Sequence, residues 1–173
     1  MSPAPVACTI AVLAAGAALA APASARHATA VFDFELIDTS LEGEVKGPRP
    51  DEQRRIVEIS TDLRRKLARD EIVTLVDIEP VASRAHETHL QNCGGCDREF
   101  AAQLGAKLSI TGTVQKVSNL ILNMNIYVRD VASGRVIAAM NADMRGNTDE
   151  SWSRTLDWLV RNRLRPALEG VPE

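Results

Sequence analysis

The feature that most constrains the fold is an alternation of apolar and polar side chains over residues 122–129, within a predicted strand over residues 120–130. In a β-strand, successive side chains point to opposite faces of the sheet. One face of this strand would carry Leu122, Met124, Ile126 and Val128, and the other Asn123, Asn125 and Tyr127. The pattern therefore predicts a strand that covers a core on one side and presents polar groups on the other.

Two further strand patterns flank this segment, over residues 107–117 and 135–144. Ser118-Asn119 separates the first pair of strands, and Ala132-Ser133-Gly134 separates the second pair. Small and polar residues of this kind form tight turns between antiparallel strands. We therefore expect the three strands to form an antiparallel meander.

The first half of the chain predicts a mixture of strands and helices. Strands are expected over residues 28–36 and 72–78, and residues 38–50 are expected to form a loop because they hold several Gly and Pro residues. Residues 51–70 predict an amphipathic helix, whose buried stripe has spacings of 3, 4 and 4 residues at Ile56, Ile59, Leu63 and Leu67.

Three further segments complete the expected order. Residues 81–91 are expected to form either a short helix or a loop, and residues 97–104 a two-turn helix. A helix is expected over residues 148–164, with Asn147 as its N-cap. The fold class is therefore α+β: a single domain over residues 26–166, with a mixed sheet whose C-terminal antiparallel three-strand meander packs on two or three helices. Residues 167–173 are expected to be a frayed tail.

The N-terminus has the pattern of an export signal. Residues 2–25 contain no charged side chain and no histidine, residues 10–21 are a continuous apolar run, and Ala23-Ser24-Ala25 matches a signal-peptidase site. We expect residues 1–25 to be a secretory signal cleaved before Arg26, which gives a periplasmic protein with no membrane span in its mature chain. The alternatives are a buried alanine-rich helix and a single membrane anchor.

The cysteine pattern agrees with export. Cleavage removes Cys8 and leaves Cys93 and Cys96, which are separated by two glycines. In an oxidising compartment these two cysteines are expected to form a disulfide with each other. A redox centre is one alternative. Another is a metal site that would combine both cysteines with His86 and His89, since these are ligands for zinc or copper.

Composition excludes several functional classes. The formal net charge is −3 and aromatic residues make up 3% of the chain, which argues against a nucleic-acid partner and against a base-stacking or sugar-binding surface. The sequence has no phosphate-binding loop and no nucleophile elbow. The paired carboxylates Asp33/Glu35 and Asp149/Glu150 come with no positioned nucleophile, and no His, Lys or Cys is evidently near them. We therefore expect no enzyme activity and no cofactor.

What remains is a surface for protein contacts. The polar strand face formed by Asn123, Asn125 and Tyr127, together with the adjoining Lys116, Ser118 and Asn119, suits hydrogen-bonded recognition of an envelope protein whose identity the sequence does not reveal. Residues 145–152, which include Trp152, are a second candidate for contact with a partner.

Several segments together resemble known envelope proteins. They are Ala30-Val31-Phe32-Asp33-Phe34, the helix over residues 59–67, the strand over 73–77, the "LGA" strand entry at residues 104–112 and the hairpin at residues 128–136. In this order they resemble the small α/β domain of the Tol-Pal protein TolB and of the curli secretion lipoprotein CsgG.

A closer resemblance is to an uncharacterised family of exported bacterial domains, carried by residues 92–96, 115–123 and 145–152. This resemblance implies an envelope protein that acts through contacts and not through catalysis.

Overall fold

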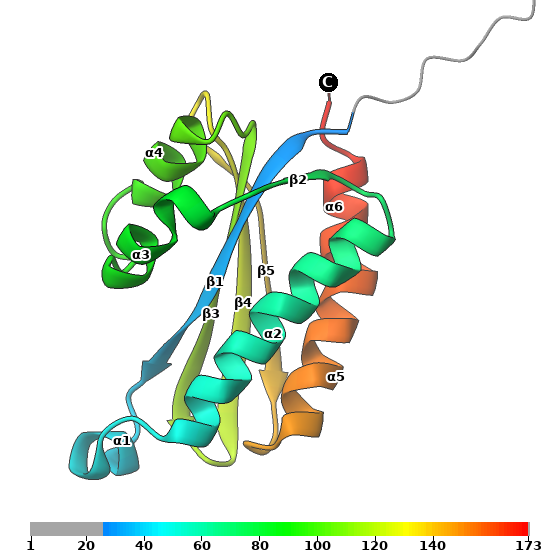
Figure 1. Ribbon diagram of the computed structural model, residues 1–173. Helices are drawn as coiled ribbons and strands as arrows, with labels where there is room; N and C mark the ends of the chain where they lie inside the picture. The colour runs from blue at the N-terminus through cyan, green and yellow to red at the C-terminus, as the bar shows by residue number, and fades with distance from the viewer. Residues whose placement is uncertain (1–25, 173) are drawn as a thin grey trace, which may run out of the picture.

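A computed structural model describes residues 26–172 and shows one five-stranded sheet (Figure 1). The strand order is β2-β1-β3-β4-β5, with β2, β1 and β3 parallel and β3, β4 and β5 antiparallel. The strands are β1 (Ala28–Asp38), β2 (Thr74–Val76), β3 (Leu108–Ser118), β4 (Ile121–Asp130) and β5 (Val136–Met144). This confirms the predicted α+β class and the antiparallel C-terminal meander.

Two long helical segments cover one face of the sheet (Figure 1). They are α2 (Pro50–Arg69) and the continuous run α5 (Asp149–Leu159), η1 (Val160–Leu164) and α6 (Arg165–Glu169). The predicted stripe of α2 is confirmed, because all four of its apolar residues are buried in the main core. The apolar side chains of β4 lie in the same core. We call this the covered face.

The opposite face is covered only in part. The short helices α3 (Glu79–Glu87) and α4 (Cys96–Gln103) pack on β1 and β3 at one end of the sheet, as Figure 1 shows. Beneath them lies a smaller core that includes Phe32, Val81 and Phe100. Beyond α3 and α4, no helix formed by residues 26–172 lies on this face of β3, β4 and β5.

Several local predictions need correction. Residues 38–50 hold a helix, α1 (Leu41–Lys46), because Ser40 accepts a hydrogen bond from the Gly43 N–H at 3.1 Å and caps it. The predicted strand over residues 72–78 is reduced to the three residues of β2. Residues 81–91, for which a helix and a loop both remained open, contain most of α3.

The C-terminal helix also differs from the prediction. Its N-cap is Thr148 and not Asn147, because the Thr148 side chain accepts from the Ser151 N–H while Asn147 is occupied by other partners. The chain stays helical to Glu169, and Leu168 is only 4% exposed. The prediction of a frayed tail is therefore wrong for residues 167–169.

The predicted signal segment, residues 1–25, lies outside the described residues. Within residues 26–172, no helix combines the length and the apolar character needed to cross a membrane.

Gly112 in β3 marks a point of close packing on the covered face. A Cβ atom at this position would lie 2.3 Å from the Phe34 ring. We expect Gly112→Ala to lower the free energy of unfolding by about 1–3 kcal/mol, because Phe34 is buried and must shift. Denaturant unfolding measures this. Gly170→Ala is the control, since its added Cβ would have no neighbour closer than 3.4 Å; an equal loss in both variants would contradict the packing argument.

Candidate partner-binding surface

The uncovered part of the sheet carries the three polar residues that the alternation of β4 predicts. Asn123, Asn125 and Tyr127 lie half-buried on the face opposite the main core. Strand pairing places Gln115, Thr113 and Thr111 of β3 on one side of them and Asp143, Asn141 and Ala139 of β5 on the other. We call these nine positions the polar face.

Hydrogen bonds across the strands hold two of the asparagines in place. Asn123 donates from Nδ2 to Asp143 Oδ1 at 2.8 Å, and Asn125 donates from Nδ2 to Thr113 Oγ1 at 3.3 Å. Each bond uses one amide hydrogen, and an asparagine side chain has two such hydrogens and a carbonyl oxygen. Within residues 26–172 these are the side-chain hydrogen bonds of Asn123 and Asn125, so their remaining groups can meet a partner.

An apolar tip adjoins the polar face where β3 turns into β4. Leu120 and Ile121 are 73% and 61% exposed, and Leu41 and Val45 of α1 are 74% and 73% exposed. The Asn119 side chain donates to Glu42 of α1 at 2.8 Å, so α1 and this turn lie together. Exposed aliphatic side chains that gather in one place are typical of a contact surface. Sequence reasoning missed this tip because the helix α1 was not predicted.

The cysteine loop lies at the other end of the polar face. Cys93 and Cys96 form the predicted disulfide. Gln91, just before the loop, donates to Thr111 Oγ1 of β3 at 2.6 Å. Asp97, just after it, is buried and accepts from Ser109 at 2.6 Å and from Arg129 at 3.0 Å. These bonds attach the loop to the sheet, directly beside Tyr127 in the strand register.

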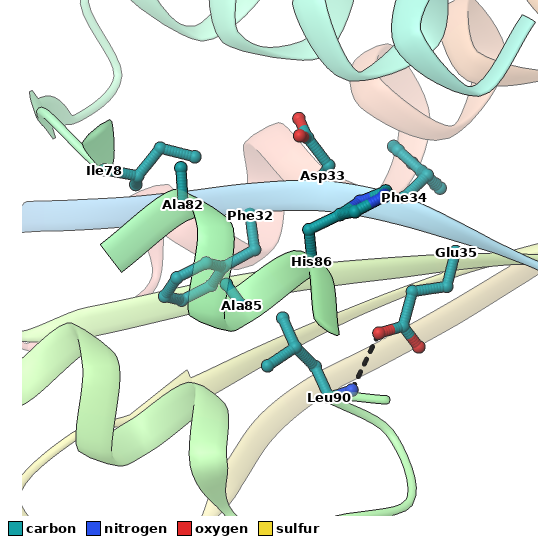
Figure 2. A pocket seen from close by; sticks show the side chains of 9 residues that line it. All are labelled: Phe32, Asp33, Phe34, Glu35, Ile78, Ala82, Ala85, His86 and Leu90. Carbon is teal, nitrogen blue, oxygen red and sulfur yellow. Dashed lines mark hydrogen bonds between the residues drawn. The ribbon is translucent and has the colours of Figure 1, made fainter. Parts of the chain in front are cut away.

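A small hollow separates α3 from β1 beneath this region, and Figure 2 shows its lining. Glu35 enters from β1 and accepts a hydrogen bond from the Leu90 N–H at 2.7 Å. The hollow has a volume of about 30 Å³, which is room for one or two water molecules only. The hollow is too small for a ligand site. The hydrogen bond between Glu35 and Leu90 helps to position the chain that leads into the cysteine loop.

The alternative metal set gains no support from the geometry. His86 and His89 are exposed, and His86 lines the hollow in Figure 2. Across residues 26–172, no three His, Cys, Asp or Glu side chains are grouped so that they could hold a metal ion. Because both sulfur atoms are joined to each other, the arrangement favours the disulfide over a four-ligand site.

Of the other two predicted contact residues, Asn119 lies in the turn at the apolar tip, whereas Trp152 lies apart from the polar face. Trp152 is 1% exposed and donates from Nε1 to Asn147 Oδ1 at 2.9 Å. Asn147 in turn donates to Asn119 Oδ1 at 3.2 Å. Trp152 is therefore a core residue, and its predicted role as a direct contact is wrong. The spacing of Trp152, Leu156 and Leu159 also predicts that these residues form the buried stripe of this helix, and the structure confirms it.

Lys116, which the sequence placed with the polar strand face, lies on the covered face instead. Its side chain is fully buried, and Nζ is 2.7 Å from Glu52 Oε1 and 3.1 Å from Asp38 Oδ2. Glu42 lies 3.5 Å from the same nitrogen. This ion cluster joins β1, α1 and α2 to β3 behind the apolar tip.

The cluster shifts the ionisation of its members. Burial lowers the pKa of Lys116, but its bonds to Glu52 and Asp38 outweigh this and raise the pKa above its ordinary value. Burial raises the pKa of Asp38, but hydrogen bonds from Ser40 and Lys116 bring it below its ordinary value. Both groups are therefore charged at neutral pH, which identifies the cluster as a structural ion network.

A protein-family model matches most of the chain. Residues 27–164 match DUF3280, whose description is "Protein of unknown function (DUF2380)". The chain belongs to this family. Membership in an uncharacterised family is thus confirmed, while the finer resemblance to TolB and CsgG stays a prediction. None of the curated proteins matches the DUF3280 chain.

Solved structures show where else this fold occurs. The DUF3280 chain is similar to the LpoB C-terminal domain from Salmonella enterica, with 14% identity, a TM-score of 0.51 and coverage of 72% of this chain and 87% of that one. For the LpoB C-terminal domain from Escherichia coli, the identity is 15% and the TM-score 0.51, and the match covers 72% of this chain and 86% of that one. For a PelC dodecamer from Paraburkholderia phytofirmans, the identity is 13% and the TM-score 0.50, and the match covers 88% of this chain and 96% of that one. At these identities the likeness concerns the fold alone.

The ion cluster can be tested by a double-mutant cycle. We expect Lys116→Met to lower the free energy of unfolding by about 3–5 kcal/mol, because it leaves the buried Glu52 charge without its lysine. Glu52→Gln combined with Lys116→Met removes both charges, so the two effects are expected to be non-additive by about 1–3 kcal/mol. Urea unfolding of all four proteins measures this, and strict additivity would show that the pair is not coupled.

Proposed function

We propose that this protein is a periplasmic, non-enzymatic accessory protein that binds another envelope protein through the polar face and the adjoining apolar tip. The observation that carries the proposal is the uncovered half of the sheet. It presents fixed amide groups at Asn123 and Asn125 and a half-buried Tyr127, and it ends in the exposed Leu120 and Ile121. Polar groups around an apolar contact are a common anatomy of protein interfaces.

The location in the envelope rests on two features of the chain. Residues 1–25 have the composition of a cleaved export signal. The two cysteines of the described domain are joined as a disulfide, which is typical of oxidising compartments such as the periplasm. The likeness to TolB and CsgG, as a finer assignment, would place the protein in the same compartment.

The role in contacts has independent support. PelC, which has a similar fold, is a dodecamer, so a chain of this architecture can serve protein–protein association. The alternative function, metal delivery through the two histidines and two cysteines, would need the disulfide to open first. The geometry favours the contact role.

The proposal predicts which surface a partner needs. For the triple variant Asn123→Ala/Asn125→Ala/Tyr127→Ala, we expect the amount of partner recovered after crosslinking in the envelope to fall at least about tenfold. The substitutions remove the fixed polar groups and leave the side chains on the core side of β4 unchanged. Quantitative mass spectrometry of the captured proteins measures this, with circular dichroism to confirm folding.

A matched control uses three exposed positions on the helices that pack on the opposite face of the sheet. Gln53→Ala/Val57→Ala/Ser153→Ala also removes three exposed side chains, but from α2 and α5. It should keep the full recovery of partner. Equal recovery from the polar-face variant and from this control would remove the polar face as the binding surface.

A further inference from the structure

The disulfide between Cys93 and Cys96 closes a very short loop. A crosslink between residues three positions apart removes little freedom from the unfolded chain, so it contributes little to stability. The loop is also held without it. Cys93 N–H donates to His89 O at 3.0 Å, Gln91 is bonded to Thr111, and Arg98 Nε donates to Val131 O at 2.8 Å. The disulfide is therefore not needed to hold the loop against the sheet.

The two cysteines differ in the exposure of the whole residue. Cys93 is exposed in the loop, whereas Cys96 is half-buried and is the first residue of α4. The Cys96 N–H lies 3.0 Å from Cys93 Sγ and donates to it. When the bond is open, this donor and the N-terminal end of α4 stabilise negative charge on Cys93 in particular.

The first turn of α4 holds two acidic residues, Asp97 and Glu99, and the one adjacent to Cys96 is compensated. Asp97 follows Cys96 directly, but its carboxylate is turned to the sheet, where Arg129 lies 3.0 Å from Oδ2 and Ser109 donates to the same oxygen. Its charge is therefore compensated by an arginine of β4. Cys93 Sγ lies 3.0 Å from the Cys96 N–H and 3.6 Å from the Leu90 carbonyl oxygen.

From this asymmetry we propose that Cys93 and Cys96 form a thiol–disulfide exchange site that accepts electrons from a dithiol of a partner protein. A partner thiolate attacks Cys93 Sγ, the Cys93–Cys96 bond breaks, and Cys96 leaves as a thiolate that takes up a proton. The partner's second thiolate then attacks its own sulfur in the mixed disulfide and releases Cys93 as a thiolate. The partner dithiol is thereby oxidised to a disulfide, and the loop disulfide is reduced to two thiols.

Docking of that partner rests on the proposed function, because the loop adjoins the polar face through the Gln91–Thr111 bond. The exchange chemistry does not rest on it. A small thiol reagent tests the site without any partner, so its failure would leave the binding role of Asn123 and Asn125 untouched.

The experiment uses glutathione with two single-cysteine variants of the mature domain. Cys96→Ser leaves Cys93 free, and Cys93→Ser leaves Cys96 free. We expect Cys93, in the first variant, to form a mixed disulfide with oxidised glutathione at least about tenfold faster than Cys96 in the second, followed by mass spectrometry at neutral pH. Both variants should keep the circular dichroism spectrum of the wild type.

The wild-type protein gives a second readout that needs no variant. Reduced glutathione should open the loop disulfide reversibly, and oxidised glutathione should close it again, while the thermal midpoint changes by only a few degrees. Equal rates for the two single cysteines would overturn the proposal. So would a wild-type disulfide that stays closed in reduced glutathione or whose reduction unfolds the domain.

Discussion

The structure depends on a difference in length between the strands of the sheet and the short helices on one of its faces. β1 and β3 are eleven residues long, which corresponds to about 36 Å of strand. The twenty residues of α2 span about 30 Å, so this helix and the α5–α6 run cover one face along nearly its whole length. The helices α3 and α4, of nine and eight residues, span only about 12–14 Å and leave the rest of the other face uncovered.

Two buried charge clusters hold the ends of this arrangement. At one end Lys116 joins α1 and α2 to β3, and the apolar tip lies in front of it. At the other end Asp97 joins the start of α4 to β3 and β4 through Ser109 and Arg129. The polar face lies between these two clusters, and its strand β3 is held by both of them. This explains how a surface without a helix over it can keep a defined geometry.

The amphipathic segments could be predicted from the sequence because their periodicity is a property of neighbouring residues. The alternation of β4 and the stripe of α2 are both confirmed. Features that depend on distant partners could not be found in this way. Lys116 occupies an inward position on β3, and only the approach of Glu52 from α2 makes its burial possible. The helix α1 was also missed, because it forms in a Gly- and Pro-rich stretch where Ser40 caps it.

The central claim is that a partner in the envelope covers the polar face. Site-specific photocrosslinking in intact cells tests it most directly, with the crosslinking amino acid placed at position 125 on β4 and, in a separate protein, at position 53 on α2. The account predicts a light-dependent adduct of defined mass from position 125 and none from position 53. Adducts of the same kind from both positions, or none from position 125, would contradict it.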